Sequence, residues 1–208
     1  MRSLFFLTII GLTSCLNNSS AVDGKRYSGN ITTRIFIQPF DDIEMNDLQF
    51  LKNTLVNWYK INVHILDRDP LPVNAYYSPR KRYIADTLLT FLKGISPTQD
   101  DYILGVTNKD ISIWKKEGVN WGIMGYGFQP GNACVISTFR LKKGLSSGKN
   151  LQERLLKVAL HELGHNFGLP HCPVQTCFLV DAEGKNKLES EREFCKKCQN
   201  YLVKNGFR

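Results

Sequence analysis

This chain of 208 residues lacks several features that would assign it to a membrane, repeat or nucleic-acid-binding class. After residue 12, no stretch is apolar enough to cross a bilayer as a helix, which requires about 20 such residues. The sequence has no internal repeat and no internal break that would divide a folded region into two domains. Histidine is also scarce, with four copies, and three of them fall within residues 161–171. These absences indicate a single globular domain, in which most of the histidines lie in one short segment.

The composition is that of a folded protein with a core, since 42% of the residues are hydrophobic and 22% are charged. The formal net charge is +8, but the basic residues form only short clusters, at residues 79–83 and at Lys142-Lys143. No basic helix with interleaved aromatic residues accompanies them. We therefore expect a solvated basic surface, a monomer, and no nucleic-acid partner.

The first fourteen residues have the character of an export signal. Arg2 precedes an apolar run over residues 4–12, which is too short to span a bilayer. The run ends in Leu12-Thr13-Ser14-Cys15, which resembles the lipobox of bacterial lipoproteins, where the signal is cleaved and the cysteine carries lipid. An ordinary cleaved signal peptide and an uncleaved hydrophobic tail are the alternatives.

On the lipoprotein interpretation, residues 1–14 are a signal peptide and Cys15 is the site of lipidation. Residues 15–29 are polar and small, as expected for a flexible tether, and residues 30–208 form the folded domain. We expect attachment through the lipid to a membrane of the bacterial cell envelope, facing the periplasm or the exterior.

Hydrophobic patterning predicts strands that alternate with helices. Strands are expected over residues 31–38, 63–66, 102–107, 122–127 and 134–139. Helices are expected from residue 41 or 42 past residue 58, over residues 78–94 and 151–167, and over residues 189–204. This order predicts an α/β fold in which helices pack on a mixed sheet.

The most informative segment is HELGHNFGLPH, at residues 161–171. Four residues apart on a helix, His161 and His165 lie on one face and can bind a single ion, and Glu162 between them can take a proton from water. Gly168 accepts a positive φ, so the helix can end there and the chain can turn back to bring His171 to the same ion. Three protein ligands with one open position are typical of catalytic zinc.

An HExxH motif also occurs by accident in ordinary helices. Here the helix carries a buried stripe of residues spaced four apart, and the histidines lie on the side opposite to that stripe. The stripe consists of Leu151, Leu155, Ala159, Leu163 and Phe167. Together with the added glycine and third histidine, this pattern favours a zinc site.

Four cysteines follow the third histidine, at positions 172, 177, 195 and 198. Two cysteine pairs can form a tetrahedral structural zinc site, and Cys195 near the start of a helix favours the thiolate. Disulfides are the competing interpretation, because an exported domain meets an oxidising compartment. The remaining cysteine of the domain, Cys134, is expected to be a buried thiol in a strand.

The pattern HELGHNFGLPH-C-x4-C-x17-C-x2-C, from His161 to Cys198, resembles the archaemetzincins, a branch of the metzincin zinc peptidases. Residues 102–141 are also similar to the strand region of that family. The resemblance implies a metzincin-like zinc-peptidase fold, with a twisted mixed sheet, an active-site helix beneath a cleft, and a C-terminal helix tied by a zinc site of four cysteines. It also implies an edge strand near residues 122–127 that pairs with substrate.

The resemblance further implies the roles of the site residues and two zinc ions per chain. It implies a catalytic zinc bound by His161, His165 and His171, with Glu162 as general base. It implies a structural zinc bound by Cys172, Cys177, Cys195 and Cys198. One position departs from the family, because Leu179 stands where a methionine forms the hydrophobic floor under the zinc. Leucine and methionine have similar volumes, so we expect this floor to be kept.

The function implied is hydrolysis of peptide bonds in peptide or protein substrates. A lipid-anchored binding or scaffold domain that keeps its zinc without useful hydrolysis is one alternative. A zinc hydrolase acting on a non-peptide component of the cell envelope is another. Retention of Glu162 disfavours the scaffold interpretation, because a purely structural metal needs no base.

Overall fold

The computed structural model describes residues 33–41, 43–116, 118–145, 148–181 and 188–208. The expected signal peptide, Cys15 and the tether lie outside these residues and stay predictions. Within the described ranges, no helix has both the length and the apolar character needed to cross a membrane.

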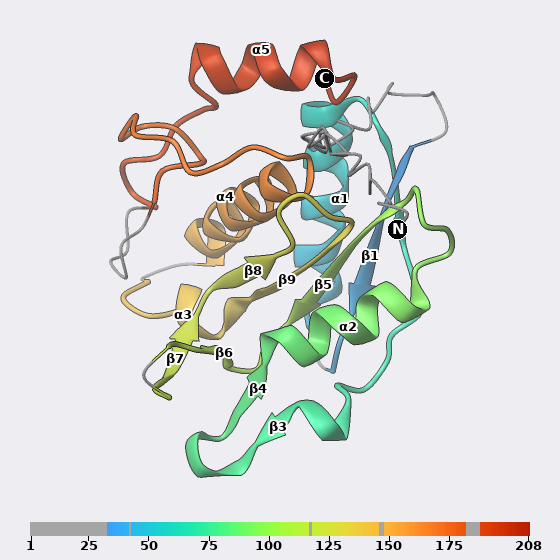
Figure 1. The fold of residues 1–208 in the computed structure, drawn as a ribbon, viewed down its shortest axis with the longest axis vertical. Helices are drawn as coiled ribbons and strands as arrows, with labels where there is room; N and C mark the ends of the chain where they lie inside the picture. Colours follow the sequence, from blue (N-terminus) through green and yellow to red (C-terminus); the bar gives the residue numbers. More distant parts are fainter. Residues whose placement is uncertain (1–32, 42, 117, 146–147, 182–187) are drawn as a thin grey trace, which may run out of the picture.

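A five-stranded sheet forms the centre of the molecule (Figure 1), with strand order β2-β1-β5-β9-β8. The strands are β1 (Arg34–Pro39), β2 (Asn62–Ile65), β5 (Tyr102–Thr107), β8 (Gly125–Gly127) and β9 (Ala133–Ser137). The first four in spatial order are parallel, and β8 runs antiparallel to β9 at the edge. All residues of β5 are buried, as expected for a parallel strand covered on both faces. The expected mixed α/β sheet is confirmed.

Helices cover both faces of this sheet (Figure 1). The helices of the described residues are α1 (Met45–Tyr59), α2 (Ala85–Ile95), α3 (Thr138–Leu141), α4 (Gly148–Asn166) and α5 (Lys196–Lys204), of which α1, α2 and α4 are the ones that cover the sheet. Helices α1 and α4 share one hydrophobic core with one face of the sheet, and α2 covers the other face with a second core. The histidine-bearing helix α4 is therefore supported along its length by the larger core.

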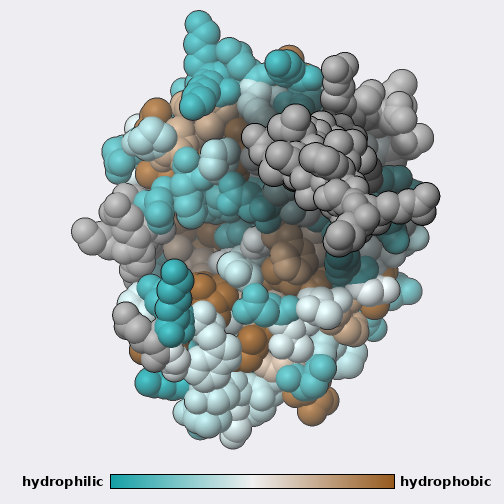
Figure 2. All heavy atoms as spheres, in the orientation of Figure 1, coloured by the Kyte–Doolittle hydropathy of each residue, from teal (hydrophilic) through white to brown (hydrophobic). Residues whose placement is uncertain are grey.

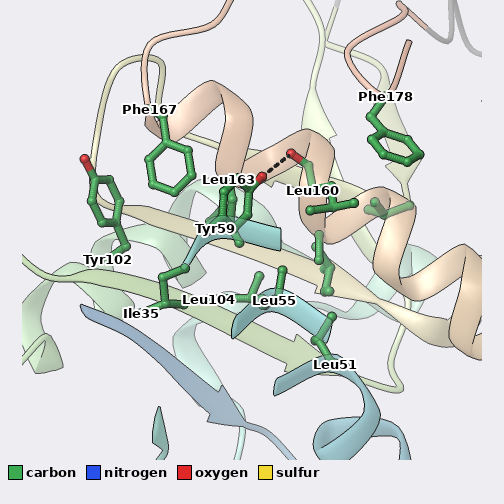
Figure 3. Packing of buried hydrophobic residues seen from close by; sticks show 14 of the residues in the cluster. Ile35, Leu51, Leu55, Tyr59, Tyr102, Leu104, Leu160, Leu163, Phe167 and Phe178 are labelled. Atoms are coloured by element: carbon green, nitrogen blue, oxygen red, sulfur yellow. Dashed lines mark hydrogen bonds between the residues drawn. The ribbon is translucent and has the colours of Figure 1, made fainter. Parts of the chain in front are cut away.

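Aromatic and aliphatic side chains of that larger core fix the position of α4 (Figure 3). Leu163 is fully buried and Phe167 is 3% exposed, as the stripe predicted. From α1, the hydroxyl of Tyr59 donates a hydrogen bond of 3.2 Å to the carbonyl oxygen of Leu160, and its ring lies 5.0 Å from that of Phe167. These contacts hold the C-terminal half of α4 at a fixed height above the sheet.

A second sheet, with order β3-β4-β6-β7, extends from the first. Its strands are β3 (Tyr76–Tyr77), β4 (Arg82–Ile84), β6 (Ile111–Trp114) and β7 (Asn120–Ile123). The predicted helix over residues 78–94 is wrong in its first part. Ser78–Arg80 form only a single 3-10 turn, which ends at Lys81 in the left-handed region with φ of 51°. The chain then enters β4, and α2 begins at Ala85.

Other predicted boundaries also differ, and the helix expected from residue 41 or 42 begins at Met45. The single strand expected over residues 122–127 is two strands in different sheets, β7 and β8. The strand expected to run to residue 139 ends at Ser137, whose hydroxyl caps α3 by accepting from the backbone N–H of Phe139. Helix α5 begins at Lys196 because the preceding backbone is hydrogen-bonded elsewhere, with Phe178 donating to Glu193 and Arg192 donating to Thr176.

On the face seen in Figure 2, apolar residues occur in several separate patches among hydrophilic and intermediate ones. The exposed large hydrophobic side chains include Trp114 and Trp121 of the second sheet. Trp121 also lines the cleft described below, so the second sheet contributes one wall of the functional site.

Candidate active site

Three histidine side chains converge at the end of α4. The Nε2 atoms of His161 and His165 lie 3.0 Å apart, and one ligand nitrogen from each of His161, His165 and His171 falls within 4.8 Å of the others. Tetrahedral nitrogens about 2.0–2.1 Å from one zinc would be roughly 3.3 Å apart. The donor set and spacing therefore fit a zinc ion.

The turn after α4 places His171, as the sequence predicted. Gly168 has a φ of 96°, and a hydrogen bond from the backbone N–H of Leu169 to the carbonyl oxygen of Gly164 closes the helix end. A Cβ at Gly168 would lie 2.7 Å from the hydroxyl of Tyr201 in α5. Both the positive φ and this close approach require glycine here.

Backbone carbonyl groups orient two of the imidazole rings. Nδ1 of His161 lies 2.7 Å from the carbonyl oxygen of Phe178, and Nδ1 of His165 lies 2.8 Å from that of Leu169. These bonds place a proton on each Nδ1 and leave each Nε2 free for a metal. Burial lowers the pKa of both histidines, and that of His161, which also faces His165, falls to about 3. Both rings are thus neutral near pH 7, which is the form that binds metal.

Glu162 lies beside the histidines and is 7% exposed. Burial raises the pKa of its carboxyl group to about 8. Its carboxyl group packs against the backbone of Gly125 in β8, where a Cβ would lie 2.6 Å from Glu162 Oε1. A bound cation would lower the pKa of this group by favouring its charged form. The carboxyl group of Glu162 is therefore held between helix α4 and the edge strand β8, and in the absence of a cation its pKa is close to neutral pH.

Leu179, the residue expected to form the hydrophobic floor, packs against α4. Its side chain is fully buried, and its Cδ2 lies 3.0 Å from the position of a Cβ on Gly164, between the two histidines of α4. Leucine thus fills the space beneath this turn of the helix, and the small Gly164 lets the two segments approach.

A cleft of about 640 Å³ runs between α4 and β8 and contains the three histidines and Glu162. Alternation along β8 directs Gly125 and Gly127 toward α4, whereas Tyr126 packs with the core around α2. Because β8 is an edge strand, its backbone groups on the side away from β9 face the cleft. The site combines a candidate metal centre, a buried carboxyl group and a strand edge that an extended peptide can pair with.

The four C-terminal cysteines also converge. Their sulfur atoms all lie within 4.8 Å of one another, the Sγ atoms of Cys172 and Cys195 are 3.6 Å apart, and all four thiols are free. Sulfurs bound tetrahedrally to zinc at about 2.3 Å would be roughly 3.8 Å apart, whereas a disulfide bond is about 2.05 Å long. The arrangement fits a metal site.

The protonation of this cluster depends on its surroundings. Burial raises the pKa of the Cys195 thiol, but hydrogen bonds from the backbone of Cys198 and from the neighbouring thiols outweigh this and lower the pKa. Burial raises the pKa of Cys177 and Cys198. A bound cation favours the thiolate form of such groups. As predicted, Cys134 is a fully buried thiol in β9, apart from this cluster.

Sequence reasoning missed several charged residues of the cleft, among them Arg140 and Glu191. The guanidinium group of Arg140 lies over Gly122 and donates to both carboxylate oxygens of Asp110, at 2.7 and 2.9 Å. Glu191 belongs to the loop before α5. Neither residue lies in a motif, and only the packing of distant segments brings them to the cleft.

Comparison with known proteins agrees with this geometry. The model of Peptidase family M54 matches residues 43–204. The archaemetzincin of Methanocaldococcus jannaschii is 32% identical over 178 residues, covering 83% of this chain and 94% of that protein. The archaemetzincin of Methanopyrus kandleri is 37% identical over 142 residues, covering 66% of this chain and 75% of that protein.

Solved structures show the same fold. The crystal structure of archaemetzincin from Methanopyrus kandleri superimposes with a TM-score of 0.73 at 28% identity, covering 86% of this chain and 97% of that one. The family match and the histidine and cysteine clusters together support zinc as the cofactor. The chain belongs to Peptidase family M54, the archaemetzincins, and is a zinc metallopeptidase.

Proposed function

We propose that His161, His165 and His171 bind the catalytic zinc and that Glu162 is the general base of peptide-bond hydrolysis. The observation that carries this proposal is the convergence of three imidazole nitrogens within 4.8 Å, next to a buried carboxyl group in a cleft. When bound at this position, zinc lowers the pKa of water and polarises the scissile carbonyl group.

In this scheme Glu162 accepts the proton of the attacking water and returns it to the leaving amine. A zinc ion bound beside it would favour the carboxylate form of Glu162, which is the form that accepts a proton. The edge of β8 orients an extended peptide by backbone hydrogen bonds, which places the scissile bond over the histidines. Gly125 keeps the strand free of a side chain where the carboxyl group of Glu162 must lie.

We propose a second, structural zinc on Cys172, Cys177, Cys195 and Cys198, which gives two zinc ions per chain. Four thiols converge with no open position for substrate, so this metal would stabilise the fold. The cluster begins at the residue after His171, so it would also hold the third histidine in place. Disulfide bonds between these cysteines are the competing interpretation, and chemical analysis distinguishes them from a zinc site.

For location, we propose that the mature chain is a monomer anchored to a membrane of the bacterial cell envelope by lipid on Cys15. The support is the sequence pattern at residues 12–15. The anchor would confine the peptidase to substrates at the membrane surface.

The test is a screen of peptides against non-peptide acyl substrates, using purified zinc-loaded protein and Glu162→Ala as the control. Hydrolysis of peptides that disappears in Glu162→Ala is the expected result. Hydrolysis confined to the acyl substrates would favour an envelope hydrolase, and no turnover of either class would favour a binding or scaffold domain.

A further inference from the structure

Glu191 is a buried carboxyl group that lines the active-site cleft without a partner. It is 4% exposed, and its Oε2 is buried with no hydrogen-bond partner. Among the residues that the structure describes, no ion pair involves Glu191. A buried carboxyl group in this condition is costly unless a donor reaches it. The cleft is the side from which such a donor can come.

The lining of the cleft that contains Glu191 includes buried apolar side chains. Val158 of α4 and Leu188, three residues before Glu191, both line the cleft and are at most 5% exposed. Lys157 donates its Nζ proton to the carbonyl oxygen of Leu188, at 2.5 Å, and is not paired with Glu191. Burial raises the pKa of Glu191 to about 7, and the charge of Lys157 acts in the opposite direction. The carboxyl group can therefore ionise near neutral pH when a cation approaches.

Of the three lysine and arginine residues that line the cleft, two are bound elsewhere. Arg140 is bound to Asp110 through Nε and Nη2. The Nζ of Lys115 lies 4.1 Å from the centre of the Trp121 ring. Both cations already have a partner within the protein. The third, Lys143, is exposed, and among the described residues neither an ion pair nor a hydrogen bond joins it to Glu191. A cation for Glu191 would then come from the substrate.

We propose that Glu191 is a specificity-determining residue that binds the cationic side chain of a lysine or arginine in the peptide substrate. The apolar walls would contact the aliphatic stem of such a side chain while its charged end meets the carboxylate. The free amino terminus of a peptide is also a cation but has no aliphatic stem. The test must therefore distinguish binding of a lysine or arginine side chain from binding of the amino terminus. This inference rests on the proposed peptidase function.

The experiment uses zinc-loaded protein and peptides that differ at one position, which carries either arginine or its neutral analogue citrulline, scanned along the peptide. Wild type should prefer arginine at one position roughly tenfold or more, mainly through KM, as expected for a hydrogen bond to a charged group. Glu191→Gln should lose this preference while it cleaves the citrulline peptide at nearly the wild-type rate. Glu193→Gln, the same change at an exposed position two residues on, should retain the preference.

Three results would overturn the proposal. One is an arginine preference that persists in Glu191→Gln. Another is an equal loss on all peptides, which indicates a structural role. The third is a Glu191-dependent preference for free over acetylated amino termini with no effect of arginine.

A binding measurement tests the role of Glu191 independently of the proposed peptidase function. In zinc-loaded Glu162→Gln protein, calorimetry should show tighter binding of the arginine peptide than of the citrulline peptide, and Glu191→Gln should abolish the difference. If this difference appears while wild type hydrolyses no peptide, the proposed function is wrong and the binding role of Glu191 stands. If hydrolysis occurs without the difference, the role of Glu191 is wrong.

Discussion

Gly125 and Glu162 form a contact that leaves no room for a side chain on the edge strand. A Cβ on Gly125 would lie 2.6 Å from Glu162 Oε1 and 2.8 Å from its Cγ. The proposed general base is therefore held against the strand that is proposed to bind substrate. Any residue other than glycine at this position must displace the carboxyl group.

Gly125→Ala should therefore reduce kcat/KM for peptide hydrolysis by about tenfold or more, because small misplacement of a catalytic group is costly. Zinc content should not change, since no histidine is altered. Gly94→Ala is the matched control. A Cβ there meets nothing within 4 Å, and alanine in α2 should stabilise the protein by up to about 1 kcal/mol. Wild-type activity in Gly125→Ala would contradict the proposed position of the base.

Cys195→Ser tests the second zinc. Purified protein prepared without oxidant should contain two zinc ions per chain, and this substitution should remove one and lower Tm, because metal binding contributes to folding free energy. Activity should fall as well, since the loop that carries His171 loses its support. Cys134→Ala changes a thiol outside the cluster and should keep both metals.

Elemental analysis is the decisive readout for this cluster. One zinc per chain, with mass spectrometry showing the four C-terminal cysteines paired as disulfides, would overturn the structural metal. The catalytic metal would be unaffected by that result.

Glu191 should also give a pH-dependent difference in stability. Its folded pKa is about 7, above the ordinary value of 4.5, so the folded state binds more protons than the unfolded state between these values. Ionisation therefore costs the folded protein stability as pH rises from about 4.5 to 7. Relative to wild type, Glu191→Gln should be more stable at pH 8 than at pH 4.5.

Urea unfolding of the two proteins at both pH values measures this change. Glu193→Gln, the same change at an exposed position, is measured alongside as the matched control. A stability difference between wild type and Glu191→Gln that is the same at pH 4.5 and 8 would contradict the buried state of the carboxyl group.

Cys15→Ser tests the location. If Cys15 is lipidated, the substitution should abolish labelling by a fatty-acid probe and release the protein from membranes, because stable anchoring requires more than one acyl chain and all are lost together. Fractionation and labelling in the bacterial host provide the measurement. A wild-type protein that is soluble and unlabelled would rule out the anchor.

The convergence of the three histidines was predictable from sequence because its geometry is local. His161 and His165 are one helical turn apart, Gly168 ends that helix, and the spacing brings His171 back to it. The cysteine cluster, whose two pairs are separated by seventeen residues, was predicted through the resemblance to the archaemetzincins, with disulfides as the competing interpretation. In the histidine cluster the motif itself determines which side chains meet.

Features that depend on tertiary pairing were not predictable. Residues 82–84 carry a helical pattern, but they form β4 because they pair with β6, which sequence reasoning did not identify. Between β7 and β8 the chain passes from one sheet to the other, although the sequence pattern of residues 122–127 predicts a single strand. Glu191 has no distinguishing neighbours in sequence, and only the fold shows that it is buried at the cleft.

The most direct test of the account is the turnover of zinc-loaded Glu162→Gln on a defined peptide, with its zinc content measured in the same preparation. Glutamine keeps the shape of the side chain but cannot act as a base, so kcat should fall by roughly 10²–10⁴-fold with zinc unchanged. His165→Ala should instead lose the catalytic zinc together with activity. A Glu162→Gln protein that hydrolyses the peptide at the wild-type rate would contradict the assignment of Glu162 as general base.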